Sequence, residues 1–346
     1  MTLRLTIWIT CILFTAALVI NSCSKKDSGS TTTPLEFKTP AGFPEPNYKF
    51  SGNPLTQQGF DLGRKLFYDG RLSKDGNFPC ASCHQQFAGF ATFDHDLSHG
   101  FNNQFTLRNS PGLFNMAWHK EMHWDGGIAH IEVQPLAPIT APNEMAEDIN
   151  NVINKLKADS AYRVMFRKAF GDDEINSQKM LKALTQFVGS IVSSESKYDK
   201  VKRGETTFTN DENTGYTLFK AKCASCHAEP MFTDFSYRNS GLAINPTLND
   251  LGRMRITNKK EDSLKFKVPS LRNVMLTSPY GHDGRFFGIP NVLEHYNSGI
   301  QDGPTLDPLL KNKIPLSTLD RFYLGQFLRT LTDSTILRDT RFSEPK

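Results

Sequence analysis

Two copies of the motif Cys-x-x-Cys-His have the clearest chemical meaning in this sequence. Two thiols at this spacing can each form a thioether bond with a haem vinyl group, and the histidine that follows is then held with its ring towards the iron. A redox-active Cys-x-x-Cys pair does not need that histidine, and a tetrahedral zinc site needs further soft ligands. We therefore predict two covalently attached haem c groups. Their attachment residues are Cys80, Cys83 and His84 in the first motif and Cys223, Cys226 and His227 in the second.

The other two cysteines lie near the N-terminus. Only Cys11 and Cys23 of the six cysteines fall outside the motifs, so none is left for a structural disulfide. Residues 1–22 have a single charge, Arg4, before an apolar run that leads to Asn-Ser-Cys23, as in a bacterial lipoprotein signal peptide. This predicts a periplasm-facing lipoprotein of a Gram-negative-type cell envelope, bound to the membrane through a lipid on Cys23. A plain signal peptide and an uncleaved anchor are the alternatives.

The composition argues against two other classes of protein. Hydrophobic residues make up 38% and charged residues 22% of the chain, which is typical neither of a disordered protein nor of a polytopic membrane protein. The formal net charge of +4 is small and evenly spread, and it predicts no nucleic-acid partner.

The length of 346 residues has room for about two domains. We expect a flexible tether over residues 23–48, because this segment is rich in Ser, Thr, Lys and Pro without an apolar period. An N-terminal haem domain is expected over 49–205 and a C-terminal one over 206–346. Residues 69–143 show no sustained period and predict long ordered loops that carry functional residues.

Helices should carry most of the fold, and the two halves share a pattern. The helix before each haem motif contains Gly-x-x-Leu-Phe, which ends at Phe67 in the first half and at Phe219 in the second. An internal duplication of a cytochrome c-like unit would produce this repeat. The fold class is therefore expected to be mainly α, with two cytochrome c-like domains that each hold one haem. Apolar spacing and capping residues predict helices that begin at Ser51 or Asn53, at Ser177 and at Asn210, and further helices over 145–170 and 317–331.

From about Asn53 to Leu331 the sequence resembles the bacterial dihaem cytochrome c peroxidases and their relatives of the MauG type. The resemblance implies an oxidoreductase that reduces hydrogen peroxide to water with electrons from a small redox partner such as a cytochrome. The segments that carry it are Leu66–Ser73, Arg108–Pro111, Trp124–Gly126, Val268–Asn273 and Pro279–Gly284.

For the first haem the resemblance implies three catalytic residues, Trp124, Gln134 and Glu144. A carboxylate can take a proton from one peroxide oxygen and return it to the departing one, which is the role expected of Glu144. Gln134 would orient the peroxide, and Trp124 would relay electrons between the haems. A core tryptophan and a helix-start glutamate are the alternatives. Arg71 and Arg108, in the shared segments, are expected to be cofactor-binding.

The resemblance also implies one calcium ion between the haems. Its expected ligands are the side-chain amide of Asn109 and the backbone carbonyls of Thr277 and Pro279. A lone asparagine before Ser-Pro is otherwise typical of a turn, so this site rests on the resemblance alone.

Two further positions bear on whether the chain is of the peroxidase type or of the MauG type. His99 is the counterpart of a loop histidine that ligates the first iron in the resting peroxidases, with His95 as a poorer rival and a surface histidine as the alternative. Tyr296 stands fourteen residues after His282, where the peroxidases have Met and the MauG type has Tyr. A phenolate ligand favours higher iron oxidation states than Met does, so it should lower the potential of the second haem. A tyrosine packed in the core is the alternative.

Two other functions stay open. One is a MauG-type dihaem oxidase that acts on a partner protein, and the other is a dihaem electron carrier without catalysis. A homodimer is also left open by the sequence. Three histidines near Trp124 are expected to have no metal role; they are His119, His123 and His130.

Overall fold

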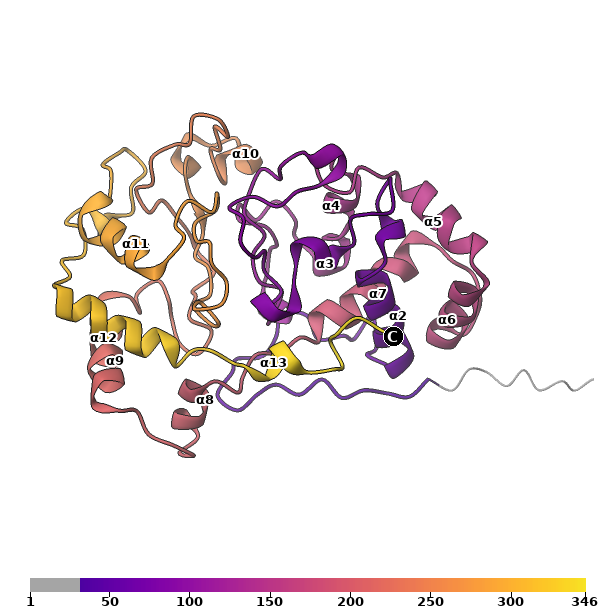
Figure 1. Ribbon diagram of the computed structural model, residues 1–346, viewed down its shortest axis with the longest axis horizontal. Helices are drawn as coiled ribbons and strands as arrows, with labels where there is room; N and C mark the ends of the chain where they lie inside the picture. Colours follow the sequence, from indigo (N-terminus) through magenta and orange to yellow (C-terminus); the bar gives the residue numbers. More distant parts are fainter. Residues whose placement is uncertain (1–31) are drawn as a thin grey trace, which may run out of the picture.

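The computed structural model describes residues 32–346, and it is mostly helical with two short antiparallel strands (Figure 1). It has two lobes, with helices α2 to α7 in the N-terminal lobe and α8 to α12 in the C-terminal lobe. The α-helices are α2 (Gln57–Phe67), α3 (Cys80–Cys83), α4 (Leu136–Thr140), α5 (Ile149–Ala158), α6 (Ser160–Phe170), α7 (Ser177–Gly189), α8 (Lys197–Lys202), α9 (Asn210–Lys222), α10 (Met254–Thr257), α11 (Ile289–Glu294), α12 (Thr318–Arg329) and α13 (Thr335–Arg338).

The strands and the short helices belong mainly to the long loops, which face each other across the middle of the molecule (Figure 1). The strands are β1 (Tyr237–Arg238) and β2 (Phe266–Lys267). The 3-10 helices are η1 (Gly70–Leu72), η2 (Gln86–Ala88), η3 (Phe101–Asn103), η4 (Met116–Trp118), η5 (Ile131–Val133), η6 (Lys260–Asp262) and η8 (Pro308–Leu310), and η7 (His295–Gly299) is a π-helix.

Each lobe is built on one close helix pair. Helix α2 packs on α7 in the first lobe, and α9 packs on α12 in the second. A Cβ atom at Gly63 would lie 1.9 Å from the carbonyl oxygen of Ala183, and one at Gly215 would lie 2.0 Å from that of Tyr323. The glycine of Gly-x-x-Leu-Phe therefore lets the two backbones touch in both lobes, and the repeat in the sequence has one structural cause.

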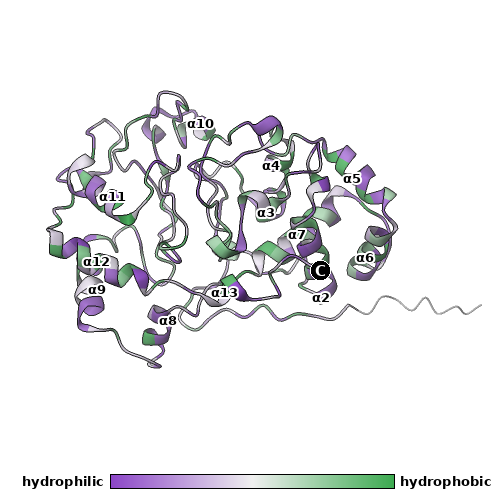
Figure 2. Cartoon of the chain, in the orientation of Figure 1, coloured by the Kyte–Doolittle hydropathy of each residue, from purple (hydrophilic) through white to green (hydrophobic). Residues whose placement is uncertain are grey.

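Two hydrophobic clusters fill the lobes. The phenylalanines that end the repeat, Phe67 and Phe219, are buried at the centres of separate clusters. Most helices that surround these clusters carry apolar and polar residues together, as Figure 2 shows for α5 and α12, because one face meets the core and the other meets water.

Three predicted helix starts differ from the observed ones by one to several residues. The first helix begins at Gln57 with Thr56 as N-cap, and not at Ser51 or Asn53. The reason is that Asn53 uses its side chain on Lys182 and Gln186 of α7, while Leu55 and Thr56 pair with the N-terminal segment. The N-caps of α7 and α9 are Asn176 and Thr209, each one residue before the predicted cap.

The segment that joins the lobes, residues 190–196, is buried in a polar network. Arg272 of the C-terminal lobe is fully buried, forms two hydrogen bonds with the carboxylate of Asp199, and reaches the carbonyl of Ser193. Asp333 accepts hydrogen bonds from three successive residues, 193 to 195, and the amide of Asn115 binds Ser193 from the other side. These bonds fix the lobes relative to each other.

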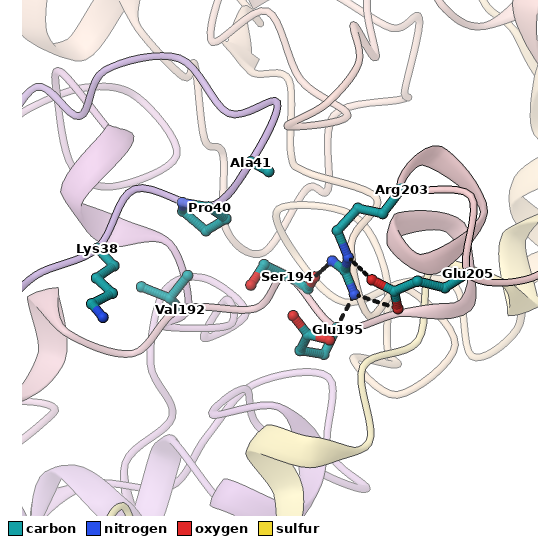
Figure 3. Close-up of a pocket in the computed structure, with 8 residues that line it drawn as sticks. All are labelled: Lys38, Pro40, Ala41, Val192, Ser194, Glu195, Arg203 and Glu205. Atoms are coloured by element: carbon teal, nitrogen blue, oxygen red, sulfur yellow. Dashed lines mark hydrogen bonds and ion pairs between the residues drawn. The ribbon is translucent and has the colours of Figure 1, made fainter.

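The tether expected over 23–48 is not free in its described part. Pro34 and Thr56 lie in a short antiparallel contact, and Phe37 and Phe43 pack with their rings 5.7 and 5.4 Å from that of Trp118. Aromatic burial thus outweighs the polar composition of this segment. A surface pocket of about 470 Å³ separates it from Arg203, which binds Glu195 and Glu205 (Figure 3), and no predicted site residue lines this pocket.

The C-terminal segment also differs from the expected domain 206–346. Residues 334–342 return to the N-terminal lobe, where Ile336 and Phe342 are buried in the core of α2 and α7. Tyr68 donates a hydrogen bond to the carbonyl of Phe342, and Gln86 donates to the carbonyls of Ile336 and Asp339.

The predicted signal peptide, its cleavage site and the lipid-bearing Cys23 lie outside the described residues and stay predictions. Within residues 32–346, none of the helices has the length and the apolar character that crossing a bilayer requires.

The helix contact in the second lobe can be tested with two glycines. Gly215→Ala should lower the free energy of unfolding by about 1–3 kcal/mol, because the added Cβ collides with the backbone of α12. Gly325→Ala, also in this helix pair but with open space around it, should raise stability by about 0.5–1 kcal/mol. Guanidinium denaturation of the haem-loaded protein measures both. Equal effects of the two substitutions would contradict the close contact.

Candidate haem sites

The first haem motif forms the short helix α3, directly after Pro79. His84 follows this helix, and its Nδ1 lies 2.9 Å from the carbonyl oxygen of Phe90. This contact makes Nδ1 the protonated nitrogen and leaves the lone pair of Nε2 for a metal. Burial lowers the pKa of the imidazole, which keeps the ring neutral as an iron ligand must be.

The second motif repeats this arrangement. The Nδ1 atom of His227 lies 3.2 Å from the carbonyl oxygen of Phe232 and 3.1 Å from that of Pro269. Burial again lowers the pKa of the ring. Both histidines are thus oriented by backbone carbonyls with Nε2 free.

The four thiols have the properties of haem attachment residues. None of them is in a disulfide, and burial raises the pKa of Cys80 and of Cys223 to about 12. A reactive dithiol would show the opposite shift, because thiolate is its active form. Buried neutral thiols that each precede an oriented histidine fit covalent attachment of a haem at both sites.

Gln134 and Glu144 lie on either side of the short helix α4. The carbonyl of Gln134 accepts a hydrogen bond from Ala137, and the amide of Glu144 donates one to Ala141. Both side chains are half-buried, and neither has a hydrogen-bond partner among the described residues. Burial raises the pKa of Glu144. The pKa of Cys83 is raised mainly by burial and further by the charge of Glu144, so this carboxyl group lies close to the first attachment site.

The loop with His99 lies against the same site. The carbonyl oxygen of His99 is 4.0 Å from the sulfur of Cys83, and the amide of Phe101 donates to the carbonyl of Glu144. Gly100 is needed here, because a Cβ would lie 2.3 Å from the carbonyl oxygen of Asn143. The structure therefore brings Cys83, His99 and Glu144 together.

The ring of His99 is held within its own loop. Its Nδ1 lies 2.6 Å from Oδ1 of Asn103, and its ring packs on Phe105 with centroids 4.5 Å apart. The ring of its rival, His95, is 5.2 Å away. Both candidates are thus at one place beside the first motif.

Trp124 joins the two lobes. Its indole N–H donates to the carbonyl of Asn109 in the N-terminal lobe at 2.9 Å, and its own carbonyl accepts from the amide of Lys267 in β2 at 2.7 Å. A residue held from both sides in this way has a fixed position at the boundary between the lobes.

The two arginines have different surroundings. Arg108 bridges the lobes, because it binds Asp125 in the loop of Trp124 and both carboxylate oxygens of Asp250 in the C-terminal lobe. Arg71 forms ion pairs with Asp69 and Asp159 inside the N-terminal lobe. The structure brings Arg108, but not Arg71, next to other predicted site residues.

Tyr296 lies in the π-helix η7, so the regular helix expected around it widens by one residue per turn. The neighbouring His295 points elsewhere, with Nε2 at 2.9 Å from the carbonyl oxygen of Ser240. Burial and the thiol groups of Cys223 and Cys226 raise the pKa of Tyr296 to about 12. The phenol therefore lies close to the second attachment site.

The first of the expected calcium ligands, Asn109, contacts the chain just after the other two. The amide nitrogen of Asn109 donates to the carbonyl of Asp96, and its backbone amide donates to the carbonyl of His282, just after Pro279. The side-chain oxygen of Asn109 and the carbonyls of Thr277 and Pro279 accept no hydrogen bond from the described residues, so three oxygens are free.

Several residues of the sites were not found from the sequence. Phe90, Phe232 and Pro269 act through backbone carbonyls, which leave no signal in residue type. Asp250, the partner of Arg108, stands in an ordinary loop.

His119 is close to Phe235 and Lys267, and its Nδ1 has no partner among the described residues.

Fold and sites together define a helical two-lobed protein with two haem-attachment motifs of the c type. The family model of the di-haem cytochrome c peroxidases matches residues 57–207. Methylamine utilization protein MauG of Methylorubrum extorquens is 36% identical over 301 residues, which are 85% of this chain and 83% of that protein. Cytochrome c551 peroxidase of Nitrosomonas europaea is 38% identical over 232 residues, which are 65% of this chain and 68% of that protein.

A solved structure agrees with this result. A MauG-like protein associated with microbial copper homeostasis is 32% identical, with a TM-score of 0.80 and coverage of 90% of this chain and 99% of its own. The chain belongs to the di-haem cytochrome c peroxidase family, and membership implies two haem c groups and oxidoreductase chemistry.

Proposed function

We propose that this protein is a peroxidase that reduces hydrogen peroxide to water at the haem of His84. The observation that carries the proposal is the carboxyl group of Glu144, which is half-buried beside Cys83, has no hydrogen-bond partner among the described residues, and has its pKa raised by burial. A carboxyl group with a raised pKa exchanges its proton more readily near neutral pH than an ordinary one, as general acid–base catalysis requires.

The residues around the first haem divide the work. When bound, the haem supplies electrons and the iron at which the O–O bond of peroxide is cleaved. Glu144 takes a proton from one peroxide oxygen and returns it to the departing oxygen. Gln134 orients the peroxide with its neutral amide, which adds no charge to the site. Trp124, held between the lobes by Asn109 and Lys267, passes electrons from one lobe to the other.

For the second haem we propose His227 and Tyr296 as the two iron ligands. The nearness of Tyr296 to Cys223 and Cys226 supports this assignment. A hard anionic ligand lowers the potential of the haem, so this lobe would store oxidising equivalents more readily than a haem with a Met ligand. Electrons would come from a small redox protein such as a cytochrome.

A MauG-type reaction on a partner protein is the second candidate. It is favoured by Tyr296 and by the match with methylamine utilization protein MauG over most of the chain. It differs from the first in that steady-state turnover of peroxide with a reduced cytochrome would be absent.

The role of Glu144 can be tested by substitution. Glu144→Gln removes the exchangeable proton but keeps the size of the side chain, and should lower the rate of peroxide reduction by about 10²–10⁴-fold. The rate is measured with a reduced cytochrome c as donor. The exposed Glu174→Gln serves as control and should have no effect. An unchanged rate in Glu144→Gln would rule out Glu144 as the acid–base group, whereas the absence of peroxide reduction in the wild type would leave the protein an electron carrier.

The ligand of the second haem can be tested by its potential. Tyr296→Met replaces an anionic oxygen with a thioether and should raise the potential of one haem while the other stays the same. A spectroelectrochemical titration measures both haems, and Tyr323→Phe in α12 is the control. If neither potential moves, Tyr296 is a packing residue.

We also propose that Asn109, Thr277 and Pro279 bind calcium, because their three free oxygens suit a hard cation. Removal of calcium with a chelator should lower the melting temperature and the peroxide rate, and added calcium should restore both. Asn109→Ala should abolish the response to calcium. If Asn109→Ala still responds fully to calcium, the calcium site lies elsewhere.

A further inference from the structure

A tyrosine and a carboxylate form a close pair beside the loop of Trp124. The phenol of Tyr237, in β1, donates a hydrogen bond of 2.5 Å to Oε2 of Glu121, in the N-terminal lobe. Both residues lie at the boundary of the lobes, and both are partly buried. None of the roles given above uses this pair.

Arg253 holds the pair against the loop. Its guanidinium lies 3.8 Å from the centre of the Tyr237 ring and donates to Oε2 of Glu121 and to the carbonyl of Asp125. A Cβ at Gly126 would lie 2.0 Å from the oxygen of Tyr237. The phenol therefore touches the backbone of the Trp124-Asp125-Gly126 turn.

The sheet gives a second connection to Trp124. Tyr237 is the cross-strand neighbour of Lys267, and the amide of Lys267 donates to the carbonyl of Trp124 at 2.7 Å. The ammonium group of Lys267 also binds the carbonyl of Glu121. Tyr237, Glu121 and Trp124 are thus parts of one rigid cluster.

On its other side Tyr237 lines a surface pocket of about 350 Å³. The pocket is formed by β1, the region before β2 and the loop around η8, and both polar and apolar atoms line it. Its lining residues include Ser236, Arg238, Asn239, Glu261, Lys265 and Asp307. Tyr237 therefore connects the loop of Trp124 with a surface pocket that small molecules can enter.

We propose that Tyr237 is a redox relay that carries oxidising equivalents from Trp124 to a phenol bound in this pocket, with Glu121 as its proton acceptor. The inference rests on the proposed function, because hydrogen peroxide is the oxidant. In each step Tyr237 loses one electron to the peroxide-oxidised protein through Trp124, and its O–H bond breaks as the proton moves to Glu121. The bound phenol then gives one electron to Tyr237, which takes its proton back from Glu121, and the proton of the oxidised phenol leaves to solvent, where it balances a proton consumed as peroxide becomes water.

The surrounding charges support a coupled transfer of electron and proton. The guanidinium over the ring opposes a positive charge on Tyr237, so an electron can leave easily only when the proton leaves with it. The carboxylate needed to take this proton is already in hydrogen-bond contact.

The test uses the full chain with both haems bound, mixed with hydrogen peroxide and frozen for EPR. The wild type should show a tyrosyl radical and should oxidise guaiacol, the phenol used as probe. Tyr237→Phe keeps the ring over Arg253 but should remove most of the radical and slow guaiacol oxidation by about tenfold. Tyr323→Phe should change neither.

Glu121→Gln keeps a hydrogen-bond acceptor but cannot take the proton, and should also reduce the radical. The change in the haem absorption spectrum on addition of peroxide should persist in all variants, and it separates the two proposals. If the wild-type spectrum does not respond, the proposed function fails. If it responds and Tyr237→Phe keeps the wild-type radical and guaiacol rate, the relay is refuted; if only Glu121→Gln is unchanged, Glu121 is not the proton acceptor.

Discussion

The structure depends on a buried ion pair, Arg272 with Asp199, at the junction of the lobes. Both charges are removed from water, so each is tolerable only with the other and with the carbonyls and hydroxyl groups around them. This requirement fixes one orientation of the C-terminal lobe on segment 190–196. Arg108 binds carboxylates from both lobes, and it fixes the same orientation of the lobes on the side of Trp124. Because these two contacts hold the lobes together, the haem motifs of the two lobes stay at a constant distance from each other.

The lobes share a frame but not a chemistry. Each has a helix with a contact glycine, a haem motif and a histidine oriented by carbonyls. Beside the first motif, loops position Glu144 and His99. Beside the second motif, the π-helix η7 positions Tyr296. The same glycine contact between two helices gives both lobes this frame, and the long loops, which lie outside these helix pairs, account for the difference. The same loops meet between the lobes, and together they form the boundary that contains Trp124 and Arg108.

Much of this could be predicted from the sequence, for physical reasons that differ from residue to residue. The haem motifs are local, and the contact glycines repeat, so both are visible without a structure. The prediction that Tyr296 serves the second haem came from its distance along the chain from His282 in the pattern of the family. In contrast, the helix start after Thr56 depends on the pairing of Thr56 with Pro34, and the order of residues 34–48 depends on packing around Trp118. Both contacts join distant parts of the chain. The partners of Arg108 and the carbonyls behind His84 and His227 are tertiary facts of the same kind.

The return of residues 334–342 to the N-terminal lobe bears on how the chain folds. Domains made during synthesis usually fold in order from the N-terminus. Here the core between α2 and α7 lacks Ile336 and Phe342 until the second lobe has been synthesised. The first lobe therefore cannot close completely before the second is present, and the two haem lobes reach their final packing as one cooperative unit.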